Sequence, residues 1–206
     1  MELIADRAAL AGPALRLAPR LLGARLVSEI AGDRVVVRLT EVEAYEGGAD
    51  PASHAFRGLT GRTTVMFGPP GHLYCYFTYG MHWCANVVCG SDGVAAAVLL
   101  RAGEVVEGAD AARSRRPASR ADRDLARGPA RLATCLGLDA STNGVDLCSP
   151  ASPVRLESVA RRRPRGVAVG PRIGISVATE RPWRFWLDGD PTVSVFKPAR
   201  PTRQTL

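Results

Sequence analysis

Residue types that could do chemistry gather in the first half of the chain. Val35, Val37 and Leu39 alternate with Arg34, Arg38 and Thr40, which predicts a strand whose odd-numbered side chains face the core. Glu41 and Glu43 continue this odd-numbered series. A strand that carries acids onto its apolar face must pair them, bulge, or open into a pocket. Because aromatic residues follow directly, we interpret this position as a pocket.

The first candidate for chemistry is Glu43. A carboxylate at a strand end, inside a ring-lined pocket, can act as a general base that activates water. The alternative is a structural ion pair with Arg38 or Arg62, which the spacing alone slightly favours. The same alternative is stronger for Glu41, and the spacing offers no independent reason to choose it.

All four tyrosines of the chain, Tyr45, Tyr74, Tyr76 and Tyr79, lie within 35 residues. Tyrosine offers a flat stacking face with a polar tip, which suits a pocket for a planar heterocycle. Alternation places Tyr74 and Tyr76 on one face of a strand, where ordinary sheet packing is the alternative. Tyr79 is expected at a hairpin tip, where its ring either is exposed to solvent without a function or acts as a wedge between base steps that distorts a duplex.

Other reactive side chains give weaker signals. His54 lies in a predicted loop, and an exposed loop histidine is more often idle than functional. No cysteines and histidines have the spacing of metal ligands, so no metal site is expected. No cysteine lies at a recognisable helix start beside a histidine and an acid, so buried thiols are expected. No phosphate-binding glycine motif follows a strand, so we expect no cofactor.

Composition limits the class of protein. A chain of 206 residues can bury one core, so a single domain spanning 1–206 is expected. The net charge of +7 is carried almost wholly by arginine, since Lys197 is the only lysine, and it suits a polyanionic partner. A genomic bias toward arginine is the alternative for the Arg/Lys ratio. Five cysteines without paired spacing, no leader and no long apolar run predict a cytoplasmic protein with no membrane contact.

The order of elements predicts a mixed α/β domain with a mostly antiparallel curved sheet, flanking helices and a protruding β-hairpin. Strands are predicted at Leu26–Ile30, Arg34–Glu43, Leu73–Tyr79, His82–Val88, Val94–Arg101 and Ile173–Ala178, and helices at Ala14–Leu22 and Pro129–Leu136. Arg113–Arg127 is charged and interrupted by proline, which indicates an exposed connection. The tail at Pro198–Leu206 is expected to fray.

Several stretches, in order along the chain, carry a family resemblance. They are Glu41-Val-Glu-Ala-Tyr45, Asp50-Pro-Ala-Ser-His54, Arg62-Thr-Thr-Val-Met-Phe-Gly-Pro-Pro-Gly71, the run from Tyr74 to Asn86, Val98-Leu-Leu-Arg101, Gly128-Pro129, Asn143-Gly-Val-Asp-Leu147, Pro171-Arg-Ile-Gly-Ile-Ser176 and Pro182-Trp-Arg-Phe185. From about Leu21 to Ser194 the chain strongly resembles the bacterial type of the alkyladenine (3-methyladenine) DNA glycosylase family of base-excision repair.

The resemblance implies roles for the pocket residues. Glu43 would be the general base that deprotonates a water, with Arg101 helping to hold that water and a backbone phosphate. Tyr45, His54 and Tyr76 would sandwich the extruded base and contact its edge. An alkylated purine is cationic and its bond to the sugar is weakened, so stacking and a positioned water suffice with little acid help.

It also implies the contacts outside the base pocket. Tyr79 would insert through the minor groove, with Met81 beside it on the hairpin, and Asn86 would exclude purines that carry a 2-amino group. Arg131, where relatives more often have lysine, would keep a phosphate contact. A glycosylase that also nicks the strand generally needs an amine that forms a Schiff base with the sugar. Lys197, the only lysine, is expected in the tail, far along the chain from the pocket residues, so a monofunctional enzyme is predicted.

The expected partner is double-stranded DNA that contains alkylated or deaminated purines, bound by a monomer associated with the nucleoid. Two other classes remain open. One is a catalytically silent protein that senses modified bases, against which the intact Glu43 argues. The other is an enzyme of formyltransferase type, suggested by similarity of fold alone, for which no folate-type site is visible.

Overall fold

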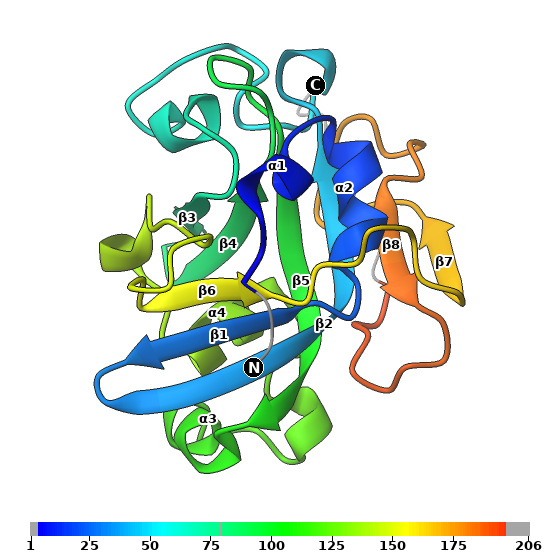
Figure 1. Ribbon diagram of the computed structural model, residues 1–206. Helices are drawn as coiled ribbons and strands as arrows, with labels where there is room; N and C mark the ends of the chain where they lie inside the picture. The colour runs from blue at the N-terminus through cyan, green and yellow to red at the C-terminus, as the bar shows by residue number, and fades with distance from the viewer. Residues whose placement is uncertain (1–3, 79, 197–206) are drawn as a thin grey trace.

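The sheet is built around one long strand, β2 (Asp33–Tyr45). In the computed structural model, which describes residues 4–78 and 80–196, β5 (Ala97–Glu107) pairs along one edge of β2 (Figure 1). On the other edge, β1 (Arg25–Ile30) pairs with the first half of β2 and β8 (Arg184–Leu187) with the second half. The central strand therefore carries two partners in succession along one edge.

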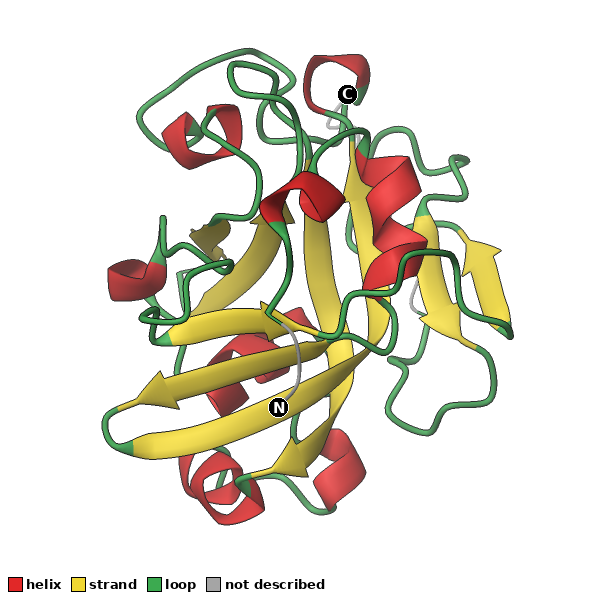
Figure 2. Cartoon of the chain, viewed as in Figure 1, coloured by secondary structure: helices red, strands yellow, loops and turns green. Residues whose placement is uncertain are grey.

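The remaining strands extend the sheet from these four. They are β3 (Leu73–Thr78), β4 (His82–Val88), β6 (Val154–Glu157) and β7 (Val167–Gly170). The order is β3-β4-β5-β2-β1-β6, and β7 joins through β8. Every pairing between these strands is antiparallel. The predicted mixed α/β fold with a curved antiparallel sheet is confirmed (Figure 2).

Short helices flank the sheet. They are α1 (Arg7–Leu10), α2 (Ala14–Leu21), α3 (Ala109–Arg115) and α4 (Pro129–Leu136), with 3-10 turns at Gly47–Ala49, Thr64–Phe67, Asp122–Asp124 and Ala140–Thr142. The helix α4 begins with proline at its first position and ends at Gly137, whose φ of 70° suits glycine. In α2, Pro19 removes a backbone donor, and the helix ends two residues later.

The core changes sides along β2, and this positions the site. Val35, Val37 and Leu39 are completely buried, as predicted. Further along, the buried apolar residues are Val42 and Ala44, which alternation places on the opposite face. Figure 1 shows α2 in front of the sheet and α4 behind it, so both faces are covered, each at a different end. The acids therefore lie on the face from which the core has withdrawn.

The pairing between β2 and β5 keeps this alternation intact. Val37 lies opposite Val105 and Glu43 opposite Leu99, which is the same offset on either side of an irregularity at Glu41. No net shift of register moves the acids to the other face. Glu43 thus stays on the face of Val37, as the odd-numbered series predicts.

Three predictions about local structure require correction. Ile173–Ala178 is not a strand, because Gly174 takes a φ of 79° and breaks the extended backbone. Arg113–Arg127 is not simply an exposed connection, since α3 enters it and Leu125 is completely buried. The strand predicted at Val94–Arg101 begins at Ala97 and continues to Glu107. The predicted tail lies outside the described residues, and in the described ranges no helix has the length and apolarity to cross a membrane.

Candidate active site

A cavity of about 520 Å³ opens where β2, β3, β4 and β5 meet the loop at 51–54. The first residue of α4 and residues 173–177 of the 171–177 segment (Pro171 to Val177) also line it. One row of cross-strand neighbours forms its floor: Tyr74 lies opposite Asn86, and Asn86 opposite Leu99. The row continues beyond the cavity lining to Glu43, which lies opposite Leu99. Residues directly opposite in antiparallel strands project to the same face, so four strands contribute to one site.

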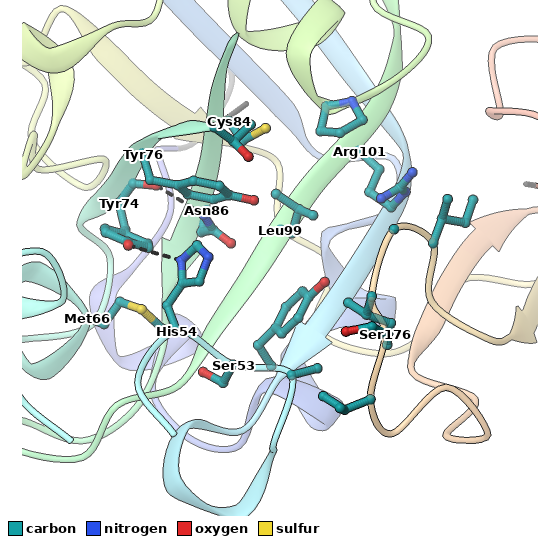
Figure 3. A pocket seen from close by; sticks show the side chains of 18 of the residues that line it. Ser53, His54, Met66, Tyr74, Tyr76, Cys84, Asn86, Leu99, Arg101 and Ser176 are labelled. Atoms are coloured by element: carbon teal, nitrogen blue, oxygen red, sulfur yellow. Dashed lines mark hydrogen bonds between the residues drawn. The ribbon is translucent and has the colours of Figure 1, made fainter. Parts of the chain in front are cut away.

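Aromatic rings form one wall of the cavity (Figure 3). The rings of Tyr74 and Tyr76 stack with centroids 5.7 Å apart. His54 meets Tyr76 edge-on at 4.5 Å, and its Nδ1 lies 3.2 Å from the hydroxyl of Tyr74. The guanidinium of Arg62 lies 5.5 Å from the centre of the Tyr76 ring. Sequence alternation correctly placed both tyrosines on one face.

The electrostatics of this wall keep His54 neutral. Burial, together with the smaller effect of the positive charge of Arg62, lowers the pKa of the imidazole to about 4. At neutral pH the ring therefore has one N–H donor and one acceptor nitrogen. A neutral histidine can accept a hydrogen bond from a ligand as well as donate one.

Glu43 is completely buried and lies just behind the cavity wall, at the corner opposite the aromatic rings. Its Oε2 accepts a hydrogen bond from the Tyr45 hydroxyl at 2.9 Å, and its Oε1 accepts one from the backbone N–H of Ile173 at 2.7 Å. Nη1 of Arg101 lies 3.2 Å from the same Oε1. All three neighbours line the cavity, so the carboxylate is one side chain away from it.

The charge of Glu43 is balanced by an ion pair different from those considered from the sequence. Arg101 is its partner, whereas Arg38 pairs with Glu104 and Asp190 on the surface. Burial raises the pKa of Glu43, and Arg101, the Ile173 N–H and the Tyr45 hydroxyl lower it only partly. A carboxylate with a raised pKa is a stronger base once it is ionised.

Arg172 fixes the 171–177 segment against β2. Its Nη1 donates to the carbonyl of Ala44 at 3.0 Å, and its Nη2 donates to Asp50 at 2.8 Å. The side chains of Arg172 and Asp50 are both completely buried. The guanidinium also lies over the Tyr45 ring, 4.6 Å from its centre. One arginine thus ties the segment to the strand that carries Glu43.

Asp50 extends the same clamp to the loop of His54. Its carboxylate accepts the backbone N–H of Ala52, and its carbonyl accepts that of Ser53. Since Arg172 directly precedes Ile173, the pair also holds the N–H that donates to Glu43. Sequence reasoning missed the role of this arginine, although Pro171 and Gly174 beside it are signals of irregular backbone.

A second cavity of about 310 Å³ shares Arg101 and Ile173 with the first. Arg127 and Arg131 line it, and the N–H of Ser194 on its wall donates to Glu41. Three guanidinium groups and one carboxylate, Asp124, which pairs with Arg127, therefore line a space next to the main cavity. The excess of positive charge favours an anionic group there.

The structure brings most of the predicted site residues together. Tyr45, His54, Tyr76, Asn86 and Arg101 all line the main cavity, with Glu43 behind it and Arg131 on the second cavity. Met81 does not line either cavity, and it is highly exposed where β3 turns into β4. Tyr79 lies outside the described residues, so its position at the hairpin tip stays a prediction.

An antiparallel sheet that ends in a ring-lined cavity, backed by a buried carboxylate and arginine, fits the family that the sequence resembles. The family model described as "Methylpurine-DNA glycosylase (MPG)" matches residues 8–191, and the chain belongs to this family. The resemblance expected from the sequence is thereby confirmed.

Similar proteins come from several bacteria. The chain is 53% identical to one from Streptomyces avermitilis over 196 residues, which cover 94% of this chain and 92% of that one. A protein from Nocardia farcinica is 54% identical over 185 residues, 87% of this chain and 85% of its own. One from Mycobacterium tuberculosis is 50% identical, covering 87% and 88%. Each carries the description "Putative 3-methyladenine DNA glycosylase".

Proposed function

We propose that this protein is a monofunctional DNA glycosylase that releases alkylated purines of the 3-methyladenine type from double-stranded DNA. The observation that carries the proposal is the position of Glu43, which contacts three residues of the cavity wall at one corner of a ring-lined slot. The family's name and the names of the relatives point to the same substrate class.

The substrate base enters the cavity after extrusion from the duplex. Extrusion costs a few kcal/mol, and it costs less for a damaged, poorly paired base. Tyr76 and the neutral His54 provide a face and an edge for the base, and Tyr45 closes the opposite side. Because a base alkylated at a ring nitrogen is cationic, its attraction to aromatic faces adds to the stacking. Asn86 on the floor would crowd a purine that carries a 2-amino group.

The chemical step is hydrolysis. We place the attacking water at the corner formed by Tyr45, Arg101 and the Ile173 backbone, where Glu43 accepts its proton as the oxygen bonds to C1′ of the sugar. The bond between C1′ and the base nitrogen breaks, and its electron pair leaves with the base, which neutralises the positive charge. No amine takes part, so the product is an intact abasic strand.

Direct measurement of base release tests the proposal. Duplex DNA treated with a methylating agent is incubated with the protein, and the free purines are separated by chromatography. We expect methylated purines to be released from a strand that stays intact until it is cleaved with alkali. Binding of the same DNA without release would indicate a silent sensor of modified bases, and strand cleavage without alkali would rule out a monofunctional enzyme.

The pH dependence of base release should identify Glu43 as the base. Only the ionised carboxylate accepts a proton, and burial raises its pKa above the ordinary value of 4.5. The rate should therefore rise with pH through a midpoint that lies above 4.5. A His54→Asn variant should keep this midpoint, because the imidazole is already neutral above a pKa of about 4. A midpoint that moves in this variant would instead implicate His54.

Salt dependence tests the phosphate contact of Arg131. The logarithm of the binding constant should fall linearly with the logarithm of salt concentration, because each neutralised phosphate releases counterions. An Arg131→Ala variant should reduce the slope by about 1. Arg34→Ala is a suitable control, since Arg34 is paired with Glu29 and Glu107 at the other end of β2. Equal slopes for the two variants would remove Arg131 from the interface.

A further inference from the structure

Glu41 has a more elaborate environment than its place outside the cavity wall suggests. It is completely buried and accepts four hydrogen bonds. Arg101 Nε and Arg184 Nη1 donate to its Oε1 at 3.2 and 3.1 Å. The hydroxyl of Ser194 donates to the same oxygen at 3.0 Å, and its backbone N–H donates to Oε2 at 2.8 Å. Burying charged groups in such a network costs desolvation free energy, and well-packed apolar side chains at the same positions would avoid this cost.

The two glutamates hold the same guanidinium at different nitrogens. Arg101 directs Nε to Glu41 and Nη1 to Glu43. A guanidinium is planar, so two anchored nitrogens fix both its position and the orientation of its plane. With Glu43 alone, the group could pivot about a single contact.

We propose that Glu41 is a positioning residue of the proposed glycosylase, holding Arg101 so that it meets both Glu43 and the attacking water. The inference rests on the proposed function and deepens it. Glu41 does not line the cavity and does not touch the substrate; it acts through Arg101.

Charge gives Glu41 a second effect on the site. The groups that face Glu43 come from five elements: Glu41 and Tyr45 of β2, Arg101 of β5, Arg184 of β8, Tyr76 of β3, and Arg172 with the Ile173 N–H of the 171–177 segment. The negative charges of Glu41 and Glu43 are balanced by the guanidinium groups of Arg101 and Arg184. The negative charge of Glu41 adds to burial in raising the pKa of Glu43. Its removal should lower that pKa.

A Glu41→Gln variant separates positioning from simple structural support. We expect kcat for base release to fall about 10- to 100-fold, as for misplaced catalytic groups. The KM for methylated duplex should stay nearly unchanged. In a plot of kcat against pH, the rising part at low pH (the acidic limb) should move to lower pH. Glu104→Gln, an exposed change of the same charge on β5, should leave kcat and the acidic limb unchanged. A loss of kcat without movement of the acidic limb would show a structural role and overturn the proposal.

A second variant covers the case in which Glu41→Gln leaves Arg184 unpaired and unfolds the protein. The double variant Glu41→Gln/Arg184→Gln restores the balance of charge. It should keep the loss in kcat, because Arg101 still lacks its Nε partner, while the acidic limb returns toward that of the wild type. Wild-type kcat in both variants would overturn the inference alone, with the proposed function intact. A wild type that releases no base would overturn the proposed function and the inference together.

Discussion

Replacing Glu43 with glutamine should nearly abolish base release, slowing it by about 10²- to 10⁴-fold, while preserving binding of methylated duplex DNA. The change keeps the shape of the side chain and removes its ability to take a proton from water. General-base catalysis contributes about 10² to 10⁴-fold, so the single-turnover rate should fall by that factor. The rings and arginines that bind DNA are unchanged, so the dissociation constant should stay close to that of the wild type.

Glu107→Gln is the matched control for this variant. Glu107 carries the same charge on β5, but it is exposed and paired with Arg34 far from the cavity. Its variant should release bases at the wild-type rate. Substantial turnover by the Glu43→Gln variant, after its folding has been checked by circular dichroism, would remove Glu43 as the base and leave the site without its central group.

Of all the single substitutions proposed, Arg172→Gln should cause the largest loss in the free energy of unfolding. The change removes the main cationic partner of the completely buried Asp50 carboxylate and leaves it only the longer contact with Nη1 of Arg181 at 3.9 Å. Breaking a buried ion pair from one side costs about 3–5 kcal/mol, against a total stability of about 5–15 kcal/mol for a domain. We expect this loss in the free energy of unfolding, measured with urea at fixed pH.

A double variant distinguishes an unpaired charge from lost packing. Asp50→Asn together with Arg172→Gln removes both charges and should recover part of the stability lost in the single variant. Arg113→Gln serves as an exposed control, because its partners Asp110 and Asp122 are solvated, and it should leave the urea midpoint almost unchanged. A loss for Arg172→Gln no larger than that of this control would mean that Asp50 reaches solvent or another partner.

Local patterns in the sequence predicted much of the scaffold. Alternation predicted β2, because side chains two residues apart share a face whatever the rest of the chain does. Turn signals and ring-rich, β-branched stretches predicted β1, β3 and β4. Proline and glycine bounded α4 for an equally local reason. The pattern failed at Ile173–Ala178, where apolar residues are typical of a strand but Gly174 allows a backbone that closes the cavity.

The candidate site divides along the same line. The residue types could be predicted from the amino-acid order alone: a carboxylate beside tyrosines on one face of a strand, and an arginine excess suited to a polyanion. The partners could not, because Glu43 pairs with Arg101 rather than Arg38, and Glu41 meets Arg184, 143 residues away, only in the folded sheet. Preferences of neighbouring residues act over a few positions, whereas a buried ion pair forms only after the sheet has closed around it.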